Sequence, residues 1–117
     1  MRYKQRDVLL LPVPFSDLSS QKVRPVIVLS RDTYNETHED IVIVGVTSQP
    51  YSREYEVTLD PDHMESGRLP RQSFVRIDKI YTLSQDIVRK HYGAVNEAFF
   101  AQLLQSILSL ISPPERT

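Results

Sequence analysis

Two side chains of opposite charge, Arg76 and Asp78, stand two positions apart in an otherwise apolar segment. If this segment is a strand, the two share one face and lie roughly 7 Å apart along the chain. Val75 and Ile77 then point to the opposite, buried face. A carboxylate beside a guanidinium can act as a general base next to a group that stabilises negative charge. The same two groups can also form a plain surface ion pair, worth under about 1 kcal/mol.

Two more polar positions occur where an apolar segment begins or ends. Arg24 directly precedes Pro25, and a proline holds the residue before it in an extended backbone, which fixes the direction of the Arg24 side chain. A guanidinium held in this way can grip a phosphate through two parallel hydrogen bonds, although an ordinary surface arginine is the alternative. Thr47 and Ser48 end the apolar segment 41–46. Their hydroxyls could bind a phosphate or a ribose, or could cap a turn.

The charges are distributed unevenly along the 117 residues, although the formal net charge is only −1. Residues 1–31 carry six Lys and Arg against two acids, and residues 66–90 carry the same numbers. Residues 32–65 carry one Arg against nine acids. If the two basic segments meet in the fold, they form a positive surface suited to a phosphate backbone. Alternatively, the acidic and basic segments neutralise one another as surface ion pairs.

The composition argues against several classes of protein. The chain has no cysteine, which rules out a disulfide scaffold and a thiolate zinc site and fits a cytoplasmic location. The three histidines, His38, His63 and His91, lack the short spacing of metal ligands, and the three glycines are too scattered for a phosphate-binding loop. No apolar run reaches the roughly 18 residues of a membrane span. We therefore expect no metal, no cofactor and no membrane partner.

The pattern of apolar residues predicts the elements that position these side chains. Strands are predicted over residues 7–13, 25–30, 41–46, 55–59 and 73–80, with a short continuation at 81–83. A polar loop is predicted over 14–23, and its length makes it a candidate for function. Residues 31–40 could hold one helical turn, and residues 87–95 could be a short strand or an irregular turn.

A C-terminal helix is predicted after residue 96. Asn96 is a good N-cap and Glu97 suits the first turn, while Pro113 and Pro114 end the helix. The apolar residues that recur at helical spacing are Phe99, Phe100, Leu103, Leu104, Ile107, Leu108 and Ile111. Such a wide stripe could cover the sheet and also pack against a second copy. Together the elements predict one domain, residues 1–117, that is mainly β with a C-terminal helix and forms a small, partly open SH3-like barrel.

Four segments, taken in order, resemble the motifs of one known family. The segments are Asp7–Leu11, a first strand; Val23–Ser30, the most distinctive motif, with its Arg-Pro; Val44–Ser48, a strand ending in threonine; and Ser73–Ile80, an Arg-x-Asp strand. The terminal helix also falls in the expected place. The chain therefore resembles the MazF/PemK family of toxins, which is Kid- and CcdB-like, over nearly its whole length.

The resemblance implies a fold and an activity. Members of this family are SH3-like barrels that form homodimers in the cytoplasm and are the toxins of toxin–antitoxin systems. They are endoribonucleases of the mRNA interferase type, which cut single-stranded RNA at selected sequences without a metal ion. The ribose 2′-hydroxyl attacks the adjacent phosphate and leaves a 2′,3′-cyclic phosphate and a 5′-hydroxyl. A cognate antitoxin protein, which also binds DNA in complex with the toxin, would hold this activity in check.

The same resemblance implies site residues, position by position. Arg24 and Thr47 match one pair of catalytic residues of the family, and Arg76 and Asp78 match another. The counterpart of Asp78 is proposed as the base and that of Arg76 as the acid. Because a guanidinium titrates above about 12, we expect Arg76 to stabilise the negative charge of the transition state instead. The candidate RNA-binding residues are Ser19, Ser20, Gln21, Lys22, Ser48, Gln49, Ser73 and Lys79.

The chain departs from the family pattern at two places. The usual glycine before the first strand is Arg6 here, and the loop before Arg24 lacks the usual Glu-Gln and the histidine that assists catalysis in some members. A barrel that has lost cleavage and only binds nucleic acid or a partner protein is therefore the alternative function. A peptide-binding SH3-like adaptor is a weaker alternative. Its groove needs clustered aromatic side chains, which the sequence does not indicate for Tyr34, Tyr51, Tyr55 and Tyr81.

Overall fold

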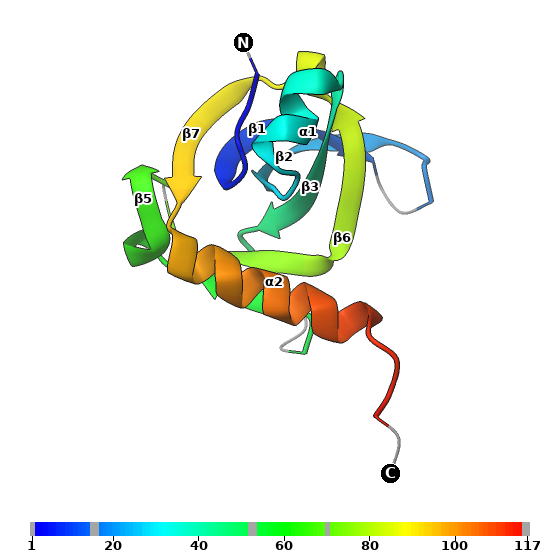
Figure 1. Ribbon diagram of the computed structural model, residues 1–117, viewed down its shortest axis with the longest axis vertical. Coiled ribbons are helices and arrows are strands. Elements are labelled where there is room, and N and C mark those ends of the chain that lie inside the picture. Colours follow the sequence, from blue (N-terminus) through cyan, green and yellow to red (C-terminus); the bar gives the residue numbers. More distant parts are fainter. Residues whose placement is uncertain (1, 15–16, 52–53, 70, 116–117) are drawn as a thin grey trace.

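The computed structural model describes residues 2–14, 17–51, 54–69 and 71–115. Seven strands form one antiparallel sheet, and they are β1 (Asp7–Pro14), β2 (Gln21–Val28), β3 (Asp40–Thr47), β4 (Glu56–Leu59), β5 (Met64–Gly67), β6 (Ser73–Ser84) and β7 (Lys90–Val95). The remaining elements are the helices α1 (Asp32–Thr37) and α2 (Glu97–Ile111) and two 3₁₀ turns, Pro61–His63 and Gln85–Ile87. Figure 1 shows the sheet curling into most of a ring, with α2 lying across one end.

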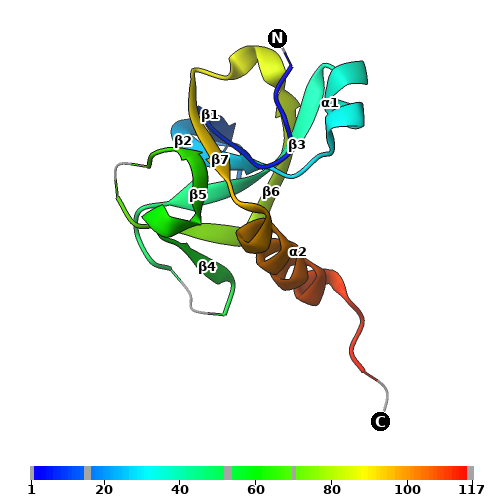
Figure 2. The ribbon, with the colours of Figure 1, turned by 60° about the vertical axis from the view of Figure 1, so that its left-hand side comes forward.

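The curled sheet is a partly open barrel rather than a closed one. Its strand order is β4-β6-β3-β2-β1-β7-β5, and within the described residues the two end strands, β4 and β5, are not paired with each other. The two helices lie toward opposite ends of the curled sheet, as Figures 1 and 2 agree. The predicted architecture, mainly β with a C-terminal helix and an incompletely closed sheet, is therefore confirmed.

Strand β1, the end of β2 (Val26–Val28) and most of β3 are apolar on both faces, because each face packs in a different hydrophobic core. One core consists of Leu9, Leu11, Val13, Val26, Val28, Ile41 and Ile43. The other core holds their strand neighbours Val8, Ile27 and Val44 together with residues of β4, β6, β7 and α2. Alternation along a strand assigns adjacent residues to opposite faces. A continuous apolar run such as that of β1 thus serves both cores at once.

The pairing of β6 with β3 is interrupted where β6 carries its charged residues. Its pairing with β3 jumps from Arg76 opposite Gly45 to Ile80 opposite Val44, so that residues 77–79 have no counterpart on β3. Such a bulge bends the strand and breaks the alternation of side chains. Figure 1 shows this bend, with the first half of β6 beside α2 and the second half turned away from it.

Strands β5 and β7 approach each other unusually closely at two glycines. Gly67 and Gly93 are paired, and both have positive φ angles, +70° and +141°. A Cβ atom on Gly67 would lie 1.7 Å from the carbonyl oxygen of Tyr92, and one on Gly93 would lie 2.0 Å from that of Ser66. Only glycine fits this contact, because both the space and the backbone conformation exclude other side chains.

Helix α2 forms as predicted. The Asn96 side-chain oxygen accepts the backbone N–H of Phe99 at 2.8 Å, which caps the helix start. The buried residues are Phe99, Phe100, Leu103 and Ile107, whereas Leu104, Leu108 and Ile111 remain exposed. The apolar stripe is therefore wider than the face that this chain covers. Neither helix within the described residues has the length and apolar character that a bilayer crossing needs.

Several predicted boundaries were wrong. Strand β2 begins at Gln21 rather than Pro25, because its ladder with β1 extends to the pair of Pro14 and Gln21. The pieces predicted at 73–80 and 81–83 are one strand, and the undecided segment 87–95 contains β7. Strand β5 was missed, since Met64–Gly67 shows no apolar alternation. Residues 15 and 16 of the predicted loop lie outside the described residues.

Candidate active site

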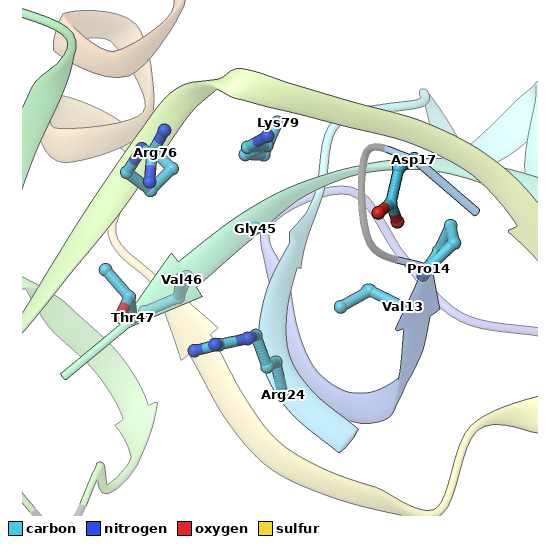
Figure 3. Close-up of a pocket in the computed structure, with 9 residues that line it drawn as sticks. All are labelled: Val13, Pro14, Asp17, Arg24, Gly45, Val46, Thr47, Arg76 and Lys79. Carbon is cyan, nitrogen blue, oxygen red and sulfur yellow. The ribbon is translucent and has the colours of Figure 1, made fainter. Parts of the chain in front are cut away.

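A cavity of about 390 Å³ opens where β1, β2, β3 and β6 come together. We call it the central pocket, and it is lined by Val13, Pro14, Asp17, Arg24, Gly45, Val46, Thr47, Arg76 and Lys79. Figure 3 shows Arg24 reaching from β2 toward Thr47, with Arg76 and Lys79 on β6 and Asp17 coming from the loop after β1. Its volume falls within the usual range for a small-molecule site. Three cations and a hydroxyl therefore face a space that an anion could enter.

Arg24 is the uncommitted cation of this pocket. It lies opposite Leu11 of β1 in the sheet, where the ladder and the following Pro25 fix its backbone. Its side chain is half-buried and has neither an ion pair nor a side-chain hydrogen bond within the described residues. All five guanidinium N–H donors are thus available to a bound anion.

Arg76, in contrast, is held by two neighbours. Its Nε and Nη2 each donate to one carboxylate oxygen of Asp78, at 3.0 Å in both cases. The guanidinium also stacks on the ring of Tyr51, with Cζ 4.0 Å from the ring centroid. Nη1 donates no hydrogen bond to any of the described residues, so Arg76 can still point N–H groups into the pocket that it lines. A cation fixed in this way needs little reorganisation when it stabilises a new negative charge.

The ion pair changes the acidity of both partners. Hydrogen bonding from Arg76 lowers the pKa of Asp78 below its ordinary value, while partial burial opposes this effect. The hydrogen bond to Asp78 raises the pKa of Arg76. The side chains of Arg76 and Asp78 are 16% and 34% exposed, so that solvent screens the pair in part. Asp78 is therefore an anion and Arg76 a cation throughout the neutral range.

The β6 bulge decides which side chains reach the central pocket. In a regular strand Arg76 and Lys79 would point to opposite faces, yet both line the pocket. Asp78, which would share the face of Arg76, lies beside its guanidinium and not on the pocket wall. Val75 and Ile77 are buried, as the sequence predicted. The bulge thus brings Lys79 to the pocket, while Asp78 stays bonded to Arg76 and is not among the residues that line the cavity.

Thr47 ends β3 at the wall of the central pocket, where a second cavity, described below, also begins. Its Oγ1 accepts the backbone N–H of Gln49 at 3.2 Å, so the hydroxyl caps a turn. The hydroxyl proton remains available to a ligand, because accepting one hydrogen bond does not consume it. The two uses considered for this threonine are therefore compatible.

A second cavity of about 210 Å³ adjoins the first and shares Arg24, Val46 and Thr47 with it. We call it the adjoining pocket, and its further lining residues are Lys22, Val23, Pro25, Ser48, Leu69, Arg71, Ser73 and Tyr92. Lys22 and Arg24 come from the first basic segment, and Arg71, Arg76 and Lys79 come from the second. The two basic segments therefore meet at the two pockets, although the whole chain is slightly acidic.

The family model for PemK-like, MazF-like toxins of type II toxin–antitoxin systems matches residues 4–111. The chain belongs to this family. The match spans all four motifs and the whole of α2, and the family resemblance drawn from the sequence is thereby confirmed. None of the curated proteins matches the chain.

Solved structures of PemK/MazF proteins share the fold. A mycobacterial endoribonuclease in complex with its cognate antitoxin aligns with a TM-score of 0.77 and 18% identity, covering 97% of this chain and 99% of that one. MazF from Deinococcus radiodurans aligns with a TM-score of 0.76 and 22% identity, over 97% and 99% of the two chains. MazE–MazF from the same organism gives 0.73 and 21%, over 97% and 100%. At these identities the likeness establishes the fold.

The structure separates the candidate RNA-binding residues of this PemK/MazF protein into two groups. Lys79 lines the central pocket, and Lys22, Ser48 and Ser73 line the adjoining pocket. The candidates that line neither pocket are Ser19, Ser20, Gln21 and Gln49, and all four are exposed. Gln21 and Lys22 also belong to β2 and not to a loop.

Two further residues of the PemK/MazF site were missed from the sequence. Asp17 lines the central pocket, and its carboxylate accepts the hydroxyl and the backbone N–H of Ser19, which lowers its pKa. An Asp two residues before a Ser in a loop is the available signal, since it is typical of an Asx turn. Nothing in the sequence indicates that Tyr51 packs on Arg76. No group of three or more His, Asp or Glu that could hold a metal ion occurs within the described ranges.

Proposed function

We propose that this chain is the toxin of a toxin–antitoxin pair and cleaves single-stranded RNA at selected sequences without a metal ion. One observation carries the proposal: Arg24, Thr47 and Arg76, from three different strands, line one cavity. The reaction leaves a 2′,3′-cyclic phosphate on one fragment and a 5′-hydroxyl on the other. Because its substrate is cellular RNA, the protein acts in the cytoplasm.

The phosphate at which the RNA is cut would lie between Arg24 and Arg76. Arg24 grips two of its oxygens, since its donors are uncommitted. When the ribose 2′-hydroxyl attacks, phosphorus becomes pentacoordinate and gains negative charge. Arg76, already fixed by Asp78 and Tyr51, stabilises that charge. The Thr47 hydroxyl donates a hydrogen bond to a phosphate or ribose oxygen. The bond from phosphorus to the 5′-oxygen then breaks, and water supplies a proton to this oxygen.

Asp78 is our proposed acceptor of the 2′-hydroxyl proton. Each of its oxygens accepts one bond from Arg76 and retains a further lone pair. The lowered pKa keeps the carboxylate deprotonated at neutral pH, which a base requires, although it weakens the driving force for proton transfer. Asp17 is the second carboxylate within reach of the site, because it lines the pocket itself.

Two protein partners complete the proposal. Solved relatives include an endoribonuclease with its cognate antitoxin and a MazE–MazF pair, which supports an antitoxin partner for this chain. The exposed apolar residues of α2, namely Leu104, Leu108 and Ile111, support a homodimer. Sedimentation equilibrium of the pure protein tests the dimer, and a monomer at micromolar concentration would contradict it.

The activity is tested by incubating the pure protein with mixed-sequence single-stranded RNA in EDTA. We expect discrete fragments with cyclic phosphate and 5′-hydroxyl ends. Arg24→Ala and Arg76→Ala should each reduce cleavage by about 100-fold or more, the usual effect of removing a donor to a developing oxyanion. Arg31→Ala is the matched control, since this exposed arginine lines neither pocket. Unchanged cleavage by the two pocket variants, with native circular dichroism, would refute the assignment.

A protein that binds RNA without cutting it is the second candidate. The observation in its favour is that both oxygens of Asp78 are engaged by Arg76, as in a purely structural ion pair. The same incubation decides between the two, because retention of RNA on a filter without any fragments indicates binding alone. Fragments that appear only without EDTA would contradict the metal-free reaction.

A further inference from the structure

Tyr51 presents a flat aromatic surface beside the cationic site. Tyr51 lies in the segment after β3. Its backbone N–H donates to Oε1 of Glu56 at 2.8 Å, which ties the residue to β4. The guanidinium of Arg76 covers one ring face, 4.0 Å from the centroid. Tyr51 is nevertheless 75% exposed. Since one face is covered, the exposure belongs to the opposite face and the ring edges.

The position of this ring is unusual for an exposed tyrosine. A large aromatic side chain in water gains nothing from exposure, whereas a ring fixed next to a phosphate site can receive an unstacked base. The contact with Arg76 orients the ring before any ligand arrives, which reduces the entropy lost on binding. Arg76 and Tyr51 then form two consecutive layers onto which a base could add a third.

We propose that the exposed face of Tyr51 stacks against one nucleobase of the RNA, on the nucleotide adjacent to the phosphate held by Arg76. The inference rests on the proposed function and names a residue that binds the substrate there. Every nucleobase has a π-face, so stacking tolerates all four bases. Tyr51 therefore supplies affinity and placement of the strand, and sequence choice is left to groups that reach base edges.

A fluorescent variant tests the contact directly. The protein has no tryptophan, so Tyr51→Trp introduces a single one, and an indole keeps the interaction with the Arg76 guanidinium. The probe is mixed-sequence single-stranded RNA with 2′-O-methyl groups, which cannot undergo 2′-hydroxyl attack. We expect saturable quenching of Trp fluorescence, because a stacked base quenches an indole. An oligonucleotide of the same length with abasic sites in place of bases should bind with little quenching.

Tyr34→Trp is the matched control. Tyr34 lies on α1, where its ring stacks on His38 with centroids 4.0 Å apart, and it lines neither pocket. Its tryptophan should not respond to the RNA. Equal quenching of both variants by RNA, or of Tyr51→Trp by RNA and the abasic strand alike, would overturn the stacking contact.

Affinity variants provide a second, independent measurement. Tyr51→Phe keeps the ring and should bind the methylated RNA like the parent protein. Tyr51→Leu removes the platform and should weaken binding about ten-fold, within the range found for single base–aromatic stacks. Unchanged affinity of Tyr51→Leu would contradict the proposal.

The two proposals fail separately in these experiments. Binding with quenching but no cleavage of unmodified RNA would overturn the nuclease activity and support the stacking contact. Binding and cleavage without quenching of Tyr51→Trp would overturn the contact and leave the nuclease intact. If RNA binds neither the parent protein nor the variants, both proposals are wrong.

Discussion

Arg24 and Arg76 carry the same charge into the central pocket but differ in their freedom. Arg76 is fixed at its edge by Asp78 and on its face by Tyr51. Arg24 has no such partner within the part of the chain that the structure describes. A fixed cation suits charge that appears only in the transition state, whereas a free one can close on the phosphate as it binds. The two arginines should therefore differ in their effects on kcat and KM.

Substitution of the two carboxylates separates their roles. Asp78→Asn keeps a hydrogen-bond acceptor for Arg76 but cannot accept a proton, and we expect kcat to fall by about 100-fold or more. Asp17→Asn alters an exposed group that is bonded to Ser19 and should reduce kcat by clearly less than this. Single-turnover cleavage of RNA measures both. The reverse ranking would identify Asp17 as the base and leave Asp78 as a residue that only positions Arg76.

The lowered pKa of Asp78 predicts the pH dependence of cleavage. Its folded-state value lies below the ordinary value of about 3.9, so the carboxylate remains deprotonated and the ion pair intact as pH falls toward about 4. The negative charge of Asp78 and its ion pair with Arg76 are lost only below about pH 4. We therefore expect no acid limb from Asp78 in kcat/KM between about pH 5 and pH 8. A limb with a midpoint near pH 6 that disappears in Asp78→Asn would contradict this expectation.

Residue types at the site were largely foreseeable, and their mutual positions were not. The motifs indicated Arg24, Thr47, Arg76 and Asp78, and three of these four line one cavity. The two hydrogen bonds between Arg76 and Asp78 agree with the prediction that they share a strand face. The bulge that brings Lys79 to the same pocket was not foreseen, because a bulge depends on pairing with β3 and leaves no pattern in β6 alone. Packing of Tyr51 on Arg76 was equally invisible, since the contact joins distant parts of the chain.

At the scale of elements, the contact between β5 and β7 depends on two glycines. Gly93→Ala would place a methyl group against the carbonyl of Ser66 and force a positive φ on alanine, so we expect a loss of at least about 1–3 kcal/mol of unfolding free energy. Thermal unfolding measures it as a drop of several degrees in Tm. Gly45→Ala is the control, because its Cβ would meet the Cβ of Lys79 at 3.4 Å. Equal stability of the two variants would contradict the argument.

Elements with a clear apolar period were predicted, and those without one were missed. The central strands and α2 carry many apolar residues that alternate or repeat at helical spacing, and propensity and burial then agree. Strand β5 is short, mostly exposed and contains one apolar residue. It exists because β7 offers an edge for pairing, which is a property of the assembled sheet. The same reason explains why β2 starts four residues earlier than its apolar run indicates.

At the scale of the molecule, the basic surface arises by folding and not from net charge. Lys22, Arg24, Arg71, Arg76 and Lys79 meet at the two pockets, whereas none of the nine acidic residues of 32–65 lines either of them. A chain of net charge −1 can thus present a local surface that attracts phosphates.

This surface predicts how RNA binding responds to salt. The logarithm of the association constant should fall linearly with the logarithm of KCl concentration, with a slope of about −0.7 for each phosphate contacted. Lys22→Ala, in the adjoining pocket, should reduce the magnitude of the slope by about 0.7. Titration of the 2′-O-methyl RNA at several salt concentrations measures it, with Arg31→Ala as control. A slope that Lys22→Ala leaves unchanged would remove the adjoining pocket from the RNA path.

The division of the interior into two cores has a consequence for the way the protein melts. Two parts of a protein that fold independently, such as two domains, can give two heat-absorption peaks. Here β1, β2 and β3 insert adjacent residues, such as Val8 and Leu9, into different cores, so that neither can come apart while the other survives. Scanning calorimetry should therefore record a single peak whose calorimetric and van't Hoff enthalpies agree.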